Sequence, residues 1–191
     1  MLRAAMTTTL ALAAMCLVIA ATLVLVRMHT LPTGLEPRRD AISDYGTTTF
    51  HVYYRAMVVM IGAGAACLAW ALQRSGDVRT SGVVWLWIFA GARILIAGFM
   101  TVRPERRVTL EAQIHLVLAA AAFVAIAFAA PIVSADLDIA VTLSRLVVAA
   151  AVATLASRAI RPLMPVFGLV ERILYAVFLT WLLVVASSLA T

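Results

Sequence analysis

The sequence predicts an all-α fold: an integral membrane bundle of six transmembrane helices with short connections, forming a single domain over residues 1–191. Of the 191 residues, 64% are hydrophobic and only 13% are charged, whereas about a quarter of the residues of a soluble domain are charged. The apolar residues gather in six runs, each long enough to cross a hydrocarbon core of roughly 30 Å as a helix. The connections between the runs leave no room for a soluble domain.

The six predicted spans cover residues 7–26, 53–72, 83–102, 113–133, 139–157 and 169–189. The first follows Arg3 and is apolar without a break from Leu10 to Val26. A signal peptide begins in a similar way, but no small-x-small cleavage pattern follows this run. We therefore expect a helix that is retained.

Small residues within the spans predict where helices approach closely, because close contact in lipid depends on short side chains. The second span contains Gly62 and Gly64, and the third contains Gly91 and Gly98, which are seven residues apart on one face. A packing role is favoured over a functional role for these glycines. Cys16 and Cys67 both fall inside spans, so no disulfide is predicted.

The polar residues gather in alternate connections. Successive spans reverse direction, so the first, third and fifth connections share one membrane face. The first connection is the longest, and Pro32, Gly34 and Pro37 interrupt any helix in it, which predicts a segment folded over the bundle. All three histidines lie in or beside the first and third connections (His29, His51 and His115). We expect these odd-numbered connections to form a polar mouth.

The basic residues predict contact with the lipid bilayer and no binding of nucleic acid. The net charge is +6, and every one of the 15 basic residues is an arginine. These arginines flank spans, where they set topology and meet lipid phosphates. Most of them lie on the odd-numbered side, which by the positive-inside rule places the mouth in the cytoplasm. Six of the nine acidic residues lie on the same side, which indicates a polar network.

The candidate ligand-binding residues of this mouth come from several connections and helix ends. They are Asp44, Tyr45, His51, Arg93, Arg103, Glu105, His115, Glu171 and Arg172. The possible ligands are a lipid headgroup, an anion, a partner protein or a second copy of the chain. No metal and no cofactor is predicted, and the sequence assigns no catalytic residue.

Arg93 and Arg145 lie within spans, where an arginine costs roughly 2.5–3.5 kcal/mol. A partner must offset that cost. For Arg93 the sequence offers Glu111, Asp44 or Glu171, and a substrate or headgroup contact is the alternative to an internal ion pair. For Arg145 it offers Asp136 and Asp138, which we expect to begin the fifth helix.

Two histidines of the mouth have structural and functional interpretations. Glu111 and His115 are spaced i, i+4, so the carboxylate can orient the imidazole, as a general base or metal ligand requires. The alternative is a histidine bonded into helix packing. His51 opens on the same face, but two histidines share a metal only if their ring nitrogens lie about 2 Å from it.

The stretch that contains Ser43 and Asp44 leads into the second span. Both residue types are good helix caps, and capping alone explains their presence there.

Four stretches of the sequence resemble a bacterial and archaeal multi-pass family known as domain of unknown function 998. They are residues 41–46 (Ala-Ile-Ser-Asp-Tyr-Gly), residues 98–104, Ile114 with His115, and residues 168–172 together with Trp181. The resemblance covers about residues 40–185. It implies a protein of six or seven membrane helices in the bacterial plasma membrane, and it supplies no substrate.

The resemblance also bears on topology and on one site residue. In similar proteins the proline of the third connection is commonly followed by Asp, whereas Glu105 follows Pro104 here. The resemblance implies cytoplasmic termini, which opposes the arginine count. The balance between the two slightly favours termini inside.

Four functions fit these patterns. We favour a non-enzymatic protein whose mouth binds a lipid headgroup, an anion or a partner. An intramembrane enzyme, resembling a lipid hydrolase and using Asp44, His115 and Glu171, is the second possibility. It requires these groups to come within hydrogen-bonding reach. A small transporter and a subunit of a larger complex are the others, although transporters usually show internal repeats, which are not evident here.

Overall fold

A computed structural model describes residues 2–99 and 109–191, and these residues form α-helices, 3₁₀-helices and loops without any strand. The long helices are α1 (Leu2–His29), α2 (His51–Ser75), α3 (Thr80–Ile96), α4 (Leu110–Leu137), α5 (Val141–Ala159) and α6 (Phe167–Ala190). Two 3₁₀-helices accompany them, η1 (Ile42–Thr47) before α2 and η2 (Arg161–Val166) before α6. The all-α prediction is therefore confirmed.

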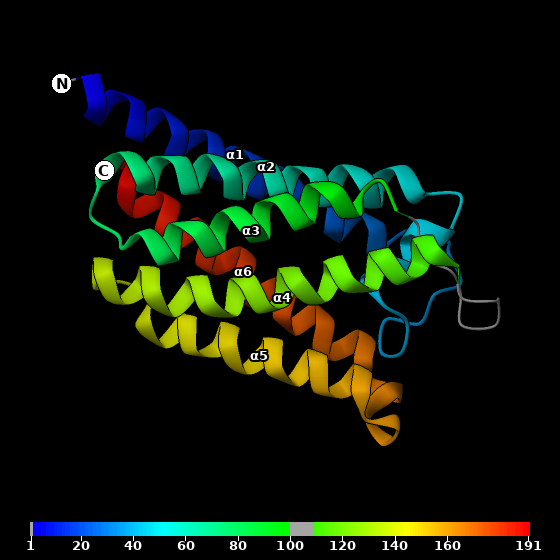
Figure 1. Cartoon of the computed structure of the whole chain (residues 1–191). Helices are drawn as coiled ribbons and strands as arrows, with labels where there is room; N and C mark the ends of the chain where they lie inside the picture. The colour runs from blue at the N-terminus through cyan, green and yellow to red at the C-terminus, as the bar shows by residue number, and fades with distance from the viewer. Residues whose placement is uncertain (1, 100–108) are drawn as a thin grey trace.

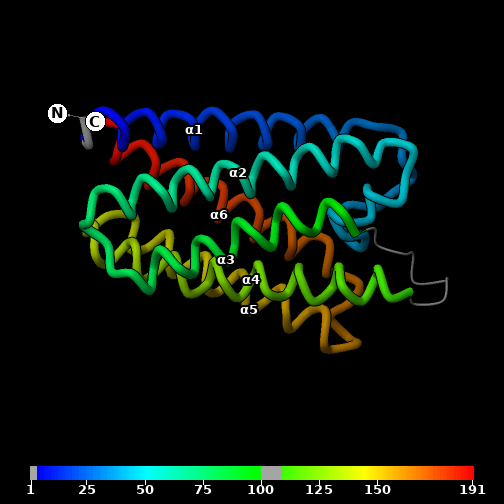
Figure 2. The backbone as a smooth tube through the Cα atoms, turned by 45° about the horizontal axis from the view of Figure 1, so that its top comes forward, coloured from blue at the N-terminus to red at the C-terminus, as the bar shows by residue number. Residues whose placement is uncertain are grey.

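The helices run up and down as a closed bundle. Each packs against its neighbours in sequence, and α6 packs against both α5 and α1, which closes the ring. Both termini lie at one end of the bundle (Figure 1). The first connection, the end of α3, the start of α4 and η2 lie at the opposite end (Figure 2). We call this second end the mouth, as the alternation of the spans predicts.

Five helical stretches in the described part of the chain are long and apolar enough to cross a membrane. They comprise α1, α2, α4, α5 and the continuous stretch of η2 with α6. The apolar helix α3 is shorter, with 17 residues, or about 26 Å at 1.5 Å per residue. The prediction of a helix to residue 102 is wrong for residues 97–99, where turns follow Ile96 next to the poor helix former Gly98. Residues 100–102 lie outside the described part.

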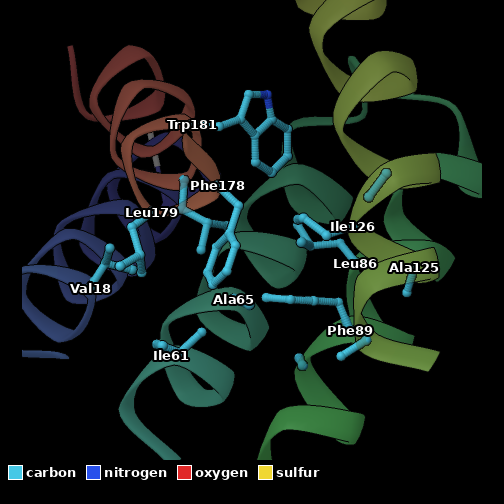
Figure 3. Packing of buried hydrophobic residues seen from close by; sticks show 14 of the residues in the cluster. Val18, Ile61, Ala65, Leu86, Phe89, Ala125, Ile126, Phe178, Leu179 and Trp181 are labelled. Atoms are coloured by element: carbon cyan, nitrogen blue, oxygen red, sulfur yellow. The ribbon is translucent and has the colours of Figure 1, made fainter. Parts of the chain in front are cut away.

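The interior of the bundle is apolar, and small residues of α2 bring its neighbours close. Side chains from α1, α2, α3, α4 and α6 meet there (Figure 3). A Cβ on Gly62 would lie 2.6 Å from Cγ1 of Ile94 and 2.9 Å from the carbonyl oxygen of Ala90 in α3. A Cβ on Gly64 would lie 3.0 Å from Cγ2 of Val18 in α1. The backbone of α2 thus touches both adjacent helices, as its small residues predict.

Gly91 does not have the predicted packing role. A Cβ at this position would meet nothing within 4 Å. Its place on α3 is next to open space, so the absence of a side chain there brings no second helix closer.

At the end opposite the mouth, an ion pair joins α3 to α4. The Arg79 side chain donates from Nε to Oδ1 of Asp136 at 2.8 Å, and its backbone N–H donates to Oδ2 at 2.9 Å. Asp136 lies in the last turn of α4, which ends at Leu137, and Asp138 caps that helix in the left-handed conformation (φ 51°). The prediction that these acids begin the fifth helix is wrong for both, because α5 begins at Val141. Asp136 pairs with Arg79 in place of Arg145, and Arg145 is exposed on α5.

Replacing Gly62 by Ala will destabilise the protein by about 1–3 kcal/mol, because the new methyl group meets the backbone of α3 as well as a side chain. Thermal unfolding in detergent measures the change. Gly91→Ala is the matched control, since its methyl group enters open space on a helix and should leave stability equal or higher. Equal melting temperatures for the two variants would contradict the close approach of α2 to α3.

Candidate functional site

Arg93 lies in the last turn of α3, and its guanidinium is buried among aromatic rings near the mouth. The residue is only 1% exposed. Its Nη1 donates a hydrogen bond of 2.7 Å to the hydroxyl of Tyr175 in α6. The centroids of four rings lie 4.7–5.5 Å from Cζ, and they belong to Phe89, Phe123, Tyr175 and Phe178. Cation–π attraction from these faces stabilises a desolvated guanidinium.

Two nitrogens of Arg93, Nε and Nη2, are buried and have no hydrogen-bond partner in the described structure. The predicted carboxylate partners therefore do not bind it directly, since its hydrogen bond goes to Tyr175. A guanidinium donates up to five hydrogen bonds, and leaving them unmade in an apolar interior is costly. Arg93 thus presents unused donors to the interior of the mouth.

Glu171 lies one helical turn before Tyr175 on α6 and is 4% exposed. Its Oε2 accepts a 2.6 Å hydrogen bond from the backbone N–H of Ile42 in η1. The positive charges of Arg93 and Arg172 both act on it. Glu171 therefore holds the first connection against α6.

His115 is buried at the start of α4. Its Nδ1 lies 2.9 Å from the carbonyl oxygen of Phe99, which can only accept, so Nδ1 carries the proton. Its Nε2 is buried without a partner in the described residues. Glu111 is exposed, and the predicted orientation of His115 by Glu111 is replaced by the Phe99 carbonyl.

His115 and Arg93 face the same region of the bundle. The charge of Arg93 acts on His115, and the ring of Tyr54 lies 6.3 Å from the imidazole. Tyr54 is also within electrostatic reach of Arg93 and Glu171. We call the group formed by Arg93, His115, Tyr54, Tyr175 and Glu171 the polar cluster.

Asp44 and Tyr45 belong to η1, which lies over this cluster. Oδ2 of Asp44 accepts a 2.8 Å hydrogen bond from the backbone N–H of Ala41, so Asp44 caps η1, which is the structural role considered for it. Tyr45 is buried, and its ring lies 5.8 Å from that of His29. Both residues therefore belong to the segment that covers the polar cluster at the mouth.

His51 is half-buried at the start of α2, and the hydrogen bond of its side chain is local. Its Nδ1 lies 3.3 Å from the carbonyl oxygen of Thr48. Among residues 2–99 and 109–191, no three His, Cys, Asp or Glu side chains gather as a metal site would require. The two remaining candidates, Arg103 and Glu105, lie outside the described residues.

Arg172 makes its hydrogen bonds outside the polar cluster and holds the first connection against α6. Its Nη1 donates to the carbonyl oxygens of Asp40 (2.8 Å) and Gly168 (2.9 Å), and its Nε donates to Nε2 of His29 (2.8 Å). A Cβ on Gly168 would collide with the carbonyl oxygens of Asp40 and Pro37. The first connection therefore packs directly on the backbone of α6.

The site contains residues that were not among the sequence candidates. Tyr175 has a signal in the sequence, because it follows Glu171 at i, i+4 on a predicted helix. His29 has a weaker one, since it ends the first span at the mouth. Tyr54 and the Phe99 carbonyl have none, because they lie far from His115 in the sequence and only the tertiary structure brings them to it.

Comparison with known proteins places most of the chain in one family. A family model described as "Protein of unknown function (DUF998)" matches residues 12–188. No curated protein and no solved structure matches the sequence.

Replacing Gly168 by Ala will push residues 37–40 away from α6, because the added methyl group meets backbone atoms that cannot rotate aside. Limited proteolysis should then cut the first connection faster than in the wild type, with a loss of stability of about 1–3 kcal/mol. Gly91→Ala serves again as the control. Unchanged proteolysis of Gly168→Ala would show that the first connection does not depend on this contact.

Proposed function

Because the chain belongs to the DUF998 family, whose description assigns no activity, we propose a function from the geometry of the mouth. The protein is a multi-pass membrane protein, and we propose that it binds an oxyanion, as a free anion or as part of a lipid headgroup, at the polar cluster. The observation that carries this proposal is Arg93, a buried cation with two donor nitrogens that no described group accepts from.

The chemistry of the polar cluster supports an oxyanion over a neutral ligand. Hydrogen bonds between a guanidinium and an anionic oxygen are about twice as strong as neutral ones. The only carboxylate of the polar cluster, Glu171, already accepts from the backbone of Ile42. A bound oxyanion supplies both the acceptors and the negative charge that Arg93 needs.

His115 narrows the class of ligand. With its proton on Nδ1, a neutral ring offers Nε2 as an acceptor. A ligand that satisfies both residues therefore carries acceptor oxygens for Arg93 and one hydroxyl group for His115. A singly protonated phosphate, a phosphate monoester or a hydroxy acid has both.

The arrangement in the membrane is part of the proposal. We infer six membrane passages, with α3 as the shortest, in a bacterial plasma membrane with cytoplasmic termini. The mouth then opens on the outer face.

The hydrogen bonds favour binding over catalysis. Asp44 accepts from Ala41 and Glu171 accepts from Ile42, and neither carboxylate is a hydrogen-bond partner of His115, whose Nδ1 bonds Phe99 and whose Nε2 has no partner in the described structure. A lipid hydrolase would need these groups to act on one another and on a substrate. Transport, a role as a complex subunit and binding of a protein partner have no comparable support among these contacts.

Adding phosphate, glycerol phosphate or lactate to the detergent-solubilised protein will raise its melting temperature. At a concentration of 100 times the Kd, the stabilisation is about 2.7 kcal/mol. Arg93→Lys keeps the charge but loses the planar donors, so a tenfold weaker Kd should reduce this stabilisation by about 1.4 kcal/mol. Arg145→Lys is the matched control, because Arg145 is exposed on α5.

Two results would count against the proposal. One is full stabilisation of Arg93→Lys by the same oxyanions. The other is the absence of any stabilisation of the wild type across the panel. Repeating the measurement with Arg103→Ala tests whether the third connection contributes a second arginine.

A further inference from the structure

A groove on the outside of the bundle runs between α1 and α6. It encloses about 340 Å³, within the range of sites for small ligands. Its walls are one face of α1 (Thr22, Leu25, Val26 and His29) and one face of α6 (Arg172, Ala176, Leu179, Thr180 and Leu183). From Arg172 to Leu183 the helix rises about 16 Å, so the groove extends from the mouth toward the middle of the membrane.

Most of the groove is effectively apolar. The hydroxyl of Thr22 donates to the carbonyl oxygen of Val18 at 2.8 Å, and that of Thr180 donates to Ala176 at 2.8 Å. Both hydroxyl protons are thus committed within their own helices. What the two threonines add to the groove is mainly their methyl groups.

The polar part of the groove is confined to the mouth end. His29 ends α1 there, and Arg172 lies in the first turns of α6. Arg172 donates to three uncharged acceptors, namely Nε2 of His29 and the carbonyl oxygens of Asp40 and Gly168. Its Nη2 is buried and has no hydrogen-bond partner in the described structure.

His29 is a hydrogen-bond partner of Arg172 but not a counterion for it. Because its Nε2 accepts from Arg172, its Nδ1 carries the proton and donates to the carbonyl oxygen of Leu25 at 2.7 Å. The ring is therefore neutral in this arrangement. The positive charge at the end of the groove has a free donor but no acidic hydrogen-bond acceptor among its described bonds.

We propose that this groove is a binding site for an anionic phospholipid, with one acyl chain between α1 and α6 and the headgroup phosphate at Arg172. The groove matches the two parts of such a lipid. Arg172 lies at the membrane boundary, where the phosphate would be, and the apolar walls extend toward the middle of the membrane, where the acyl chain would be. Both helices are long and apolar enough to span the membrane, so the groove faces lipid. The site is separate from the polar cluster, because Arg172 lines the groove and bonds His29, whereas Glu171 next to it does not line the groove and bonds Ile42.

Native mass spectrometry of the whole chain tests the proposal, with phosphatidylglycerol, phosphatidylethanolamine and inorganic phosphate as probes. Ala176→Phe fills the groove without changing a charge. Ala153→Phe is the matched control, because Ala153 is an exposed alanine on α5. We expect the fraction of protein that retains phosphatidylglycerol to fall roughly tenfold in Ala176→Phe and to stay unchanged in Ala153→Phe. Retention of phosphatidylethanolamine should be lower than that of phosphatidylglycerol in the wild type.

Three results would overturn the proposal. The first is equal retention of phosphatidylglycerol by the two phenylalanine variants. The second is retention of inorganic phosphate that Ala176→Phe abolishes, which would mean that the site takes the anion without the chain. The third is a wild-type dimer that only Ala176→Phe dissociates, which would make the groove an interface between two copies. Arg93→Lys should keep the share of phosphatidylglycerol that Ala176→Phe loses, so failure at this groove and failure at the polar cluster are distinguishable.

Discussion

The buried guanidinium of Arg93 is the constraint on which the mouth of this bundle depends. An arginine within a span costs roughly 2.5–3.5 kcal/mol unless its surroundings compensate. Compensation here needs three helices at once, because the surrounding rings come from α3, α4 and α6 and the Tyr175 hydroxyl accepts from Nη1. Glu171 lies one turn before Tyr175 on α6, and its hydrogen bond to Ile42 brings the first connection into the same structure.

Two adjacent residues on α6 divide the mouth into an inner and an outer part. Successive side chains of a helix point about 100° apart. Glu171 accordingly faces the polar cluster, whereas Arg172 reaches outward to His29 and to the backbone of the first connection. Gly168, one turn earlier, lets that connection lie against α6. One turn of helix thus positions both proposed binding sites, and each keeps a donor without a partner in the described structure.

The two sites suit ligands of related chemistry. Each combines a guanidinium with apolar or aromatic walls, and the groove continues inward between α1 and α6. In the proposed arrangement, an amphiphile held at Arg172 would have its headgroup at the same end of the bundle as the polar cluster. The first connection lies between them, since η1 covers the cluster through Ile42 and residues 37–40 pack on α6.

The sequence by itself determined the all-α membrane fold, the family and the end of the molecule at which the polar residues gather. These follow from composition and from the alternation of spans, which act locally along the chain. The side-chain pairings between helices could not be predicted in this way. Arg93 bonds Tyr175, His115 bonds the Phe99 carbonyl and Asp136 bonds Arg79, each in place of a partner that sequence spacing offered. Only the tertiary structure decided these, because rotation and depth of each helix depend on small residues such as Gly62 and Gly168, and no spacing along one helix specifies which face meets another.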